Sequence, residues 1–276
     1  MCQEGPKFNG MQRRQLLAAL LGAGATVMLT NCNNVGFSPT TASSGSDDSS
    51  DSSDSGGSSS DGSCAEMATE TNGPYPADGS NSSGDGSSAK LDMVYTGSPI
   101  IRRDIAESIA GVPLTLNLSL QNVRNSCATL SNYYIYIWHC TPTGQYSAYT
   151  GSTNGGSHDR TETYFRGIQQ TDSNGEVTFT TVYPGWYTGR AIHIHAEVYK
   201  NLDDATPVKI TQFAFPMSIN KTVAAKTSYG YKGTSGMMDN SSDGIFSDGT
   251  STEMLTVTTD SSTGGYAATL ALKVKA

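Results

Sequence analysis

Two histidines separated by a single residue mark the stretch of this chain best suited to chemistry. Residues 183–199 read YPGWYTGRAIHIHAEVY, so His193 and His195 stand on either side of Ile194. In a strand, this alternation places both imidazoles on one face, roughly 7 Å apart along the backbone, and Ile194 on the other face, toward a core. Arg190 lies three residues before the first histidine. Two imidazoles in this arrangement can bind one metal ion.

Two tyrosines can add oxygen ligands to the imidazole pair. Tyr146 ends the string WHCTPTGQY, and Tyr187 ends PGWY just before the histidines. Free tyrosine has a pKa of about 10, but a bound trivalent metal would hold the phenolate form well below that pH. Phenolates are hard anions, so two phenols with two imidazoles favour Fe(III), whereas zinc sites more often combine histidine with cysteine or carboxylate.

Their spacing alone is also compatible with a purely structural role for the same residues. Tyrosine is a common strand residue, and a His-x-His pair can lie on an ordinary exposed face. By the same reasoning, the remaining tyrosines near the motifs are expected in the core or at its rim, and the remaining histidines are expected to be structural or exposed. These residues are Tyr134, Tyr136, Tyr183, His139 and His158.

The composition favours a β-rich domain and argues against nucleic acid as a partner. The chain has 276 residues, enough for one sizeable domain or two small ones, and it contains 30 glycines. Glycine, serine and threonine are common and long helix-forming runs are missing, which favours strands over a helical bundle. The formal net charge of -8 disfavours binding to a polyanion.

The first 32 residues are predicted to be an export signal. Arg13 and Arg14 precede the apolar run LLAALLGAGATVML, which is too short and too rich in glycine for a stable membrane span. The paired arginines indicate the twin-arginine route, and an ordinary secretory signal is the alternative. Cys32 follows Leu-Thr-Asn and resembles a lipoprotein cleavage box, apart from the asparagine. A lipid anchor on Cys32 and plain cleavage nearby both remain open.

A linker and one folded domain are expected after the signal. Residues 33–63 contain a tract of serine, aspartate and glycine with hardly an apolar residue, so this segment is predicted to be disordered. Residues 64–276 are expected to form the folded domain. A flexible linker behind a lipidated cysteine would suit a protein held away from a membrane surface.

Strand signals run through the folded domain. Leucines alternate with polar residues over 114–120, and YYIYIW over 133–138 is rich in β-branched and aromatic residues. Asn174-Gly175 between two strand-like runs predicts a hairpin. Further strands are expected over 176–182, 207–215, 254–258 and 268–274, and a long surface loop over 221–248. Short strands joined by glycine, serine and asparagine turns predict an all-β fold with a β-sandwich core and long irregular loops.

The cysteines agree with export to an oxidising compartment. Cys127 and Cys140 flank a predicted strand and can form a disulfide there. Cys64 is an equal candidate for pairing, so the sequence leaves the pairing open. Either pairing leaves an odd thiol.

Several strings together resemble the intradiol ring-cleavage dioxygenases, the family of the catechol and protocatechuate dioxygenases. They are IYIWHCTPTGQYSAY, FRGIQQTDSNGEVTFTTVYPGWYTGRAIHIHAEVY and ITQFAF, with weaker similarity from NGPYP at Asn72 to DGIF at Asp243. The order of GQY, RG followed by TD, PGWY, Arg-x-x-His-x-His and a later TQ is specific. The resemblance covers most of the domain expected after the linker.

The resemblance implies a non-haem Fe(III) enzyme that opens catechols between their two hydroxyls with O2, giving muconate-type products. By motif, the metal ligands would be Tyr146, Tyr187, His193 and His195. Arg190 matches the arginine that faces the substrate ring, and Gln212 resembles a glutamine behind the metal ligands. Tyr187 matches the ligand that the substrate displaces.

This chain also departs from the family pattern. Only TGRAI separates Tyr187 from His193, where many members carry a longer insert, so the substrate cannot be inferred from the family. A signal and linker stand where some members have a helical dimerisation region, which indicates an exported subgroup and leaves the oligomeric state open. A catechol-binding or iron-binding surface module without turnover is the alternative function.

Overall fold

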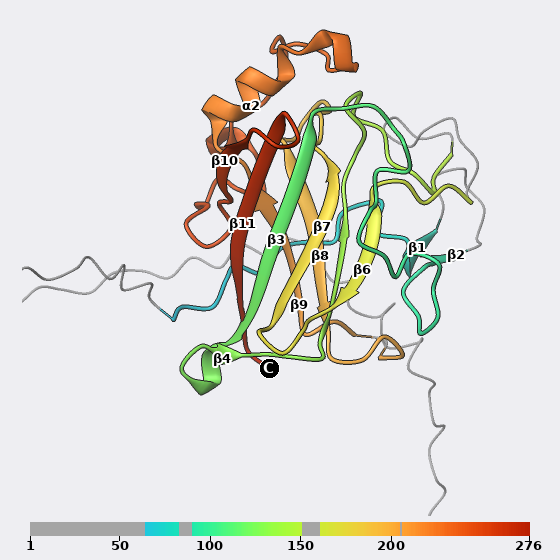
Figure 1. The fold of residues 1–276 in the computed structure, drawn as a ribbon, viewed down its shortest axis with the longest axis vertical. Coiled ribbons are helices and arrows are strands. Elements are labelled where there is room, and N and C mark those ends of the chain that lie inside the picture. Colours follow the sequence, from blue (N-terminus) through green and yellow to red (C-terminus); the bar gives the residue numbers. More distant parts are fainter. Residues whose placement is uncertain (1–63, 83–89, 151–160, 205) are drawn as a thin grey trace, which may run out of the picture. The chain divides into compact units, whose positions relative to one another are not determined.

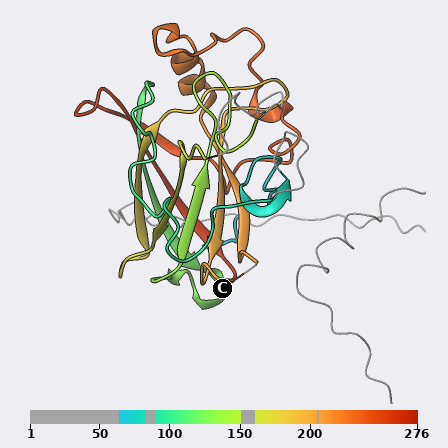
Figure 2. The same ribbon diagram turned by 90° about the vertical axis from the view of Figure 1, so that its right-hand side faces the viewer.

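Two β-sheets form the body of the protein (Figure 1). The computed structural model describes residues 64–82, 90–150, 161–204 and 206–276. The predicted export signal, Cys32, the predicted linker over 33–63 and His158 lie outside these residues. Figures 1 and 2 show the strands of both sheets running roughly along the long axis of the folded part, with a helix beyond one end of them.

The first sheet has five strands around a central strand, β3. Strand β11 runs parallel to β3 on one side, β7 runs antiparallel to it on the other, and the short β4 pairs with its end. Residues of β3 alternate between buried and half-buried positions, because only one face of this sheet meets the core. The strands are β3 (Pro113–Asn122), β4 (Ala128–Thr129), β7 (Glu176–Val182), β10 (Thr256–Asp260) and β11 (Gly265–Val274).

The second sheet has four antiparallel strands in the order β6-β5-β8-β9. All seven residues of β8 are buried, so both faces of the sheet are covered at this strand. The strands are β5 (Tyr134–Trp138), β6 (Arg166–Gln170), β8 (His193–Tyr199) and β9 (Lys209–Ala214).

The main hydrophobic core lies between the two sheets. Leucines of β3 face aliphatic residues of β5 and β8 and phenylalanines of β9 and the segment after it. This arrangement confirms the predicted all-β sandwich. Smaller elements complete the described chain: β1 (Asp78–Ser82), β2 (Lys90–Asp92), α2 (Met217–Ala224) and three 3-10 turns at Val123–Asn125, Thr227–Tyr229 and Asn240–Ser242.

Two predictions about loops were wrong. Gly175 does form a turn, with its N–H donating to Asp172, but the strands on either side of it belong to different sheets and do not form a hairpin. The turn therefore carries the chain from one layer to the other. The segment 221–248 is not simply a surface loop, because it begins inside α2 and buries Tyr231 and Phe246.

The disulfide joins Cys64 to Cys127, with a Cα–Cα distance of 5.7 Å. It ties the start of the described chain to the turn between β3 and β4. The sequence left the pairing among Cys64, Cys127 and Cys140 open, and the structure pairs Cys127 with Cys64 and not with Cys140. Cys140 is a buried free thiol whose sulfur lies 3.3 Å from the carbonyl oxygen of Gly185.

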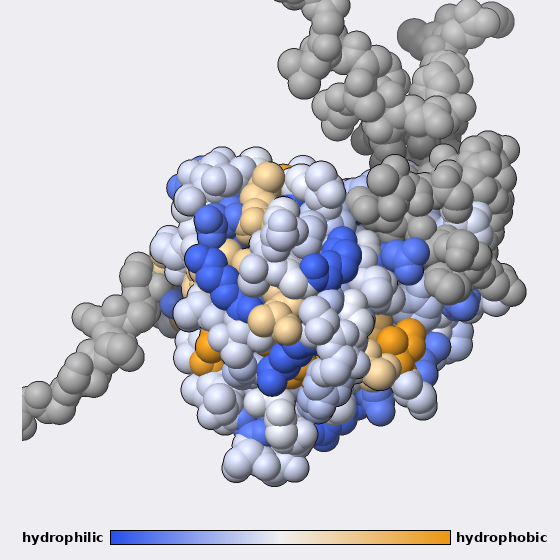
Figure 3. All heavy atoms as spheres, turned by 90° about the horizontal axis from the view of Figure 1, so that it is seen from above, coloured by the Kyte–Doolittle hydropathy of each residue, from blue (hydrophilic) through white to orange (hydrophobic). Residues whose placement is uncertain are grey.

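The surface offers no broad apolar face in the view of Figure 3, where hydrophobic residues form only small separate groups among hydrophilic ones. Nor does any helix within the described residues have the length and apolar character needed to span a membrane.

Candidate metal centre

Strand β8 points His193 and His195 away from the main core, toward the second face of the four-stranded sheet. Ile194, between them, is fully buried in the core. In the register of the sheet, His195 stands beside Trp138 of β5 on one side and beside Gln212 of β9 on the other. Paired residues of neighbouring strands share a face, so these three side chains form one row.

The two tyrosines come from loops that approach each other backbone to backbone. Tyr146 follows the turn at 141–144, and Tyr187 ends the segment PGWY. The N–H of Gly185 donates to the carbonyl of Thr141 at 3.2 Å. A β-carbon at Gly185 would clash with the carbonyl of Pro142, and one at Gly144 would clash with that of Trp186. Glycine at both positions therefore allows the phenols to converge.

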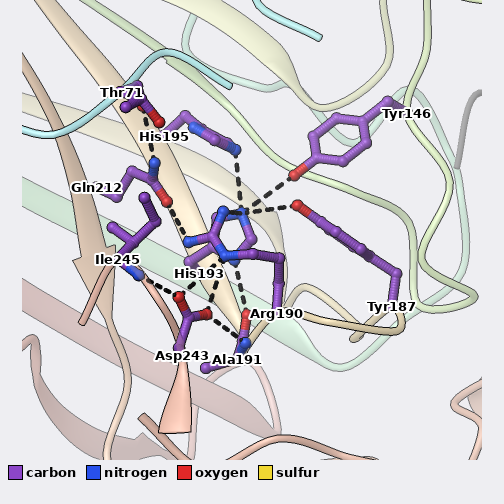
Figure 4. A network of polar contacts seen from close by, with 10 residues as sticks. All are labelled: Thr71, Tyr146, Tyr187, Arg190, Ala191, His193, His195, Gln212, Asp243 and Ile245. Carbon is purple, nitrogen blue, oxygen red and sulfur yellow. Dashed lines mark hydrogen bonds and ion pairs between the residues drawn. The ribbon is translucent and has the colours of Figure 1, made fainter. Parts of the chain in front are cut away.

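Four side-chain donor atoms meet at one point (Figure 4). The Nε2 atom of His193 lies 3.0 Å from Nε2 of His195. The hydroxyl oxygens of Tyr146 and Tyr187 each lie 3.3 Å from the same nitrogen. Donors that bind one metal ion at about 2.0–2.2 Å are themselves about 3 Å apart, so the spacing suits a shared ion.

The tautomer of His193 also suits metal binding. Its Nδ1 donates to the carbonyl of Ala191 at 2.7 Å, which leaves the lone pair of Nε2 facing the other donors. No three His, Cys, Asp or Glu side chains gather as a metal site anywhere in the described part of the chain. The cluster instead combines two imidazoles with two phenols, and the phenols as anions would favour Fe(III).

Burial keeps all four donors neutral when no cation is bound. It lowers the pKa of His193 to about 3, and the charge of Arg190 adds to this effect. Burial and the neighbouring His193 lower the pKa of His195 well below its usual value. Burial likewise raises the pKa of Tyr187 to about 12 and that of Tyr146 well above its usual value. A bound cation would reverse the shift of the phenols and release their protons.

Arg190 lies beside the four donors and is fixed from two sides. Its Nε donates to both carboxylate oxygens of Asp243, at 3.1 and 2.9 Å, and its Nη2 donates to Oε1 of Gln212 at 2.6 Å. Its Nη1 is 3.5 Å from Nε2 of His193. The guanidinium is therefore held at the edge of the cluster in one orientation.

Asp243 anchors this arrangement from a fully buried position. It accepts hydrogen bonds from the backbone N–H groups of Ala191 and Ile245 at 2.6 and 2.8 Å. Burial alone would raise the pKa of Asp243, but these two N–H groups and Arg190 together hold it below the usual value. The carboxylate thus stays charged and fixes both the guanidinium and the backbone that leads into β8.

The segment at 71–76 covers the cluster. The carbonyl of Thr71 accepts from Nε2 of Gln212 at 2.8 Å. A β-carbon at Gly73 would lie 3.0 Å from the ring of His195, and φ is +67° there, so both the close approach and the backbone conformation favour glycine. Tyr75 stacks on Tyr146, with ring centroids 4.9 Å apart.

The structure brings together all six residues singled out from the sequence: Tyr146, Tyr187, Arg190, His193, His195 and Gln212 (Figure 4). His139 lies apart from them and is a structural histidine, bonded to Thr181 and the Cys140 carbonyl. Tyr136 and Tyr183 are fully buried, as expected of core residues.

Sequence reasoning gave no role to Asp243, Trp138, Tyr75 or Gly73. Asp243 stands in a polar stretch, and the signal that could have found it is the string DGIF, where the weaker similarity to the family ends. Trp138 lies parallel to the ring of His195, with centroids 4.8 Å apart. That contact depends on the register of two strands, which the sequence does not state.

No family model matches this sequence, and no curated protein matches it either. Among solved structures, an intradiol ring-cleavage dioxygenase from Tetranychus urticae is similar, with 25% identity and a TM-score of 0.60 over 76% of this chain and 95% of that chain. A second dioxygenase crystal structure shows 25% identity and a TM-score of 0.59 over 76% of this chain and 94% of that one. The resemblance seen in the motifs is thus confirmed: the chain resembles intradiol ring-cleavage dioxygenases in three dimensions.

Proposed function

We propose that this protein is an exported non-haem Fe(III) dioxygenase. It cleaves catechol-type rings between the two hydroxyl-bearing carbons, adds both atoms of O2 and gives muconate-type dicarboxylates. The observation that carries this proposal is the convergence of three donor atoms within 3.0–3.3 Å of the Nε2 atom of His193. Similarity to dioxygenase structures adds independent support.

The metal ligands are Tyr146, Tyr187, His193 and His195. Fe(III), when bound, supplies the Lewis acidity that makes a coordinated catecholate reactive toward O2. The four side chains are at most 6% exposed, so water is largely excluded from around them. Tyr187 is the more exposed of the two phenols, which suits a ligand that gives way to substrate.

Arg190 stabilises the negative charge that develops on the substrate ring. Its position near His193 Nε2 places a fixed positive group beside the reacting atoms, where little water competes. Gln212 and Asp243 act through Arg190 by holding its guanidinium. A module that only bound iron would have no use for a cation held so firmly at this position.

Residues 1–32 serve as a twin-arginine export signal, residues 33–63 as a linker and residues 64–276 as the catalytic domain. The disulfide between Cys64 and Cys127 supports an oxidising destination. Mass spectrometry of the mature N-terminus tests the anchor: a diacylglyceryl group on Cys32 supports a lipoprotein, and an unmodified start excludes the anchor. Export favours catechols found outside the cell as substrates, and activity confined to protocatechuate would contradict this.

Ferric loading followed by oxygen-electrode traces with a panel of catechols tests the enzyme proposal. The expected result is a coloured protein with a phenolate-to-iron absorption band, which consumes one O2 for each catechol. A coloured protein that binds catechol without consuming O2 would instead identify a binding module. A colourless protein that gains no band with Fe(III) would exclude the metal centre altogether.

A further inference from the structure

We propose that Arg166 is a positioning residue for the candidate metal centre, fixing Tyr146 and His195 from behind through two separate sets of contacts. This inference rests on the proposed function, since it takes those two residues as metal ligands. Arg166 contacts none of the four donor atoms itself, so its role is indirect.

The location of Arg166 extends the row of residues that contains His195. Arg166 lies on β6 opposite Trp138 of β5, and Trp138 lies opposite His195 of β8. The row continues to Gln212 on β9. It therefore crosses the whole four-stranded sheet on the face that carries the centre, with Arg166 at one edge.

Arg166 is a fully buried cation whose five hydrogen bonds all reach neutral oxygens. Burying a guanidinium is costly unless its N–H groups have hydrogen-bond acceptors. A buried arginine with this many fixed acceptors therefore indicates a specific role for its side chain. The planar fork of arginine can bond several fixed acceptors at once, which a lysine ammonium cannot do in the same geometry.

The first set of contacts reaches Tyr146. Nε of Arg166 donates to Oγ of Ser147, and Nη2 donates to the Ser147 carbonyl, both at 2.9 Å. Ser147 directly follows Tyr146 in the chain. Nη1 donates to the carbonyl of Tyr75 at 2.9 Å, and the ring of Tyr75 stacks on that of Tyr146. Arg166 thereby holds the backbone beside the phenol and also the ring that packs on it.

The second set of contacts reaches His195 through stacked rings. Nη1 of Arg166 donates to the hydroxyl of Tyr136 at 2.9 Å, and this hydroxyl donates to the carbonyl of Pro76 at 2.6 Å. The ring of Tyr136 stacks on Trp138 at 4.8 Å. Trp138 in turn lies flat against His195, at 4.8 Å and 4°. One guanidinium thus supports a phenol ligand on one side and an imidazole ligand on the other.

Ferric-ion affinity and the phenolate-to-iron band of Arg166→Lys and Arg166→Met test the proposal. Groups that orient metal ligands typically change metal affinity by about 10- to 100-fold when they are removed. We expect a loss of about tenfold in Arg166→Lys, a larger loss in Arg166→Met, and a shifted absorption band in both. Competition with a chelator gives the affinity, and circular dichroism reports the fold.

Lys209→Met is the matched control for losing a buried cation. Lys209 lies on the other edge strand of the same sheet, pairs with Glu66 at 2.7 Å and also donates to Met67 and Thr69. It occupies the face toward the main core, because it pairs with Val198 in the register. We expect Lys209→Met to lower the melting temperature and to leave the ferric affinity and the band unchanged.

Tyr136→Phe keeps the proposal testable if the Arg166 variants do not fold. It removes only the hydroxyl that joins Arg166 to the stacked rings, and we expect a severalfold loss of ferric affinity with a shifted band. Tyr231→Phe is its control, because the Tyr231 hydroxyl has the same pattern, accepting from Val112 N–H and donating to the Tyr183 carbonyl.

Wild-type affinity and an unshifted band in the folded Arg166 variants, or in Tyr136→Phe, would overturn the proposal. So would equal losses in Lys209→Met, which would attribute the effect to general stability. A wild-type protein that shows no ferric band would instead refute the proposed function, so the two failures are distinguishable.

Discussion

The two sheets bury their strands in different ways. Strand β3 of the five-stranded sheet alternates between buried and half-buried positions, because its outer face meets solvent. Strand β8 of the four-stranded sheet is buried at every position. Its second face carries His193, His195 and Glu197, which are polar and yet at most 3% exposed. The buried polar side chains therefore distinguish the four-stranded sheet, which carries the candidate metal centre, from the five-stranded sheet, which supports the fold.

Covering segments create this difference. Over the four-stranded sheet lie the segment at 71–76 and the two tyrosine loops. Directly after that segment, Ala77 N–H donates to the hydroxyl of Tyr149, in the loop that carries Tyr146, at 2.8 Å. The outer face of the five-stranded sheet instead presents small polar residues, among them Asn117 and Thr178, which are hydrogen-bonded to each other at 2.8 Å. Of these two sheet faces, the one that loops enclose carries the candidate metal centre.

The largest expected effect is loss of the metal from the enclosed face. We expect His195→Ala or Tyr146→Phe to abolish the ferric band and all oxygen uptake, because each change would remove one of the four proposed ligands. Titration with Fe(III), followed by absorbance, measures this. A His195→Ala protein with full ferric affinity would remove the basis for assigning the centre to this face.

Leu118→Ala on the other sheet is the contrasting change. Leu118 is 1% exposed in the main core, and truncating a buried leucine costs about 2–5 kcal/mol of unfolding free energy. We expect that loss in chemical denaturation, with ferric affinity retained in the folded protein. If Leu118→Ala lost iron as His195→Ala is expected to, metal binding would depend on both sheets and not on the four-stranded sheet alone.

A smaller effect is expected when the cation beside the centre is removed. Arg190→Ala should keep the ferric band and lower kcat/KM for catechol by about 10²- to 10³-fold, the size typical of a group that stabilises developing charge. Lys232→Ala is the control, because Lys232 is an exposed cation that lies over Trp186 at 4.1 Å. Unchanged turnover in Arg190→Ala would refute its assigned role.

Periodicity predicted the strands of both sheets well. The leucine alternation over 114–120 matches β3, and the alternation of histidine with Ile194 matches β8 and its two faces. These patterns reflect which side of a strand meets the core, and that information is local. The motifs around Tyr146 and Tyr187 are local as well, and so their residues could be named in advance.

Contacts between residues that are distant in the sequence could not be predicted from local sequence patterns. The turn at Gly175 looks like a hairpin turn, but whether its two strands pair depends on which partners β3 and β5 offer them. Asp243 is distant in sequence from Arg190, and only the folded chain brings the carboxylate to 2.9 Å from the guanidinium. The disulfide partner of Cys127 is fixed in the same way, by where the chain folds back.

The smallest expected effect on the metal centre concerns a buried acid in a turn beside the edge of the four-stranded sheet. Glu253 is fully buried next to the end of β9, where its carbonyl accepts from Ala214 N–H at 3.0 Å. Burial, together with the negative charges of Glu70 and Asp248, raises the pKa of Glu253 to about 8. Between its ordinary value of 4.5 and that pKa, the folded protein keeps a proton that the unfolded chain releases, so stability falls as pH rises.

Glu253→Gln removes this dependence, because an amide stays neutral. Near pH 4 the melting temperature of the variant should match that of the wild type, and above about pH 8 it should be higher than that of the wild type. Glu176→Gln, at an exposed position of β7, should change neither value. If Glu253→Gln instead lowered ferric affinity at all pH values, Glu253 would belong to the metal centre, and the polar burial on this sheet would serve that centre alone.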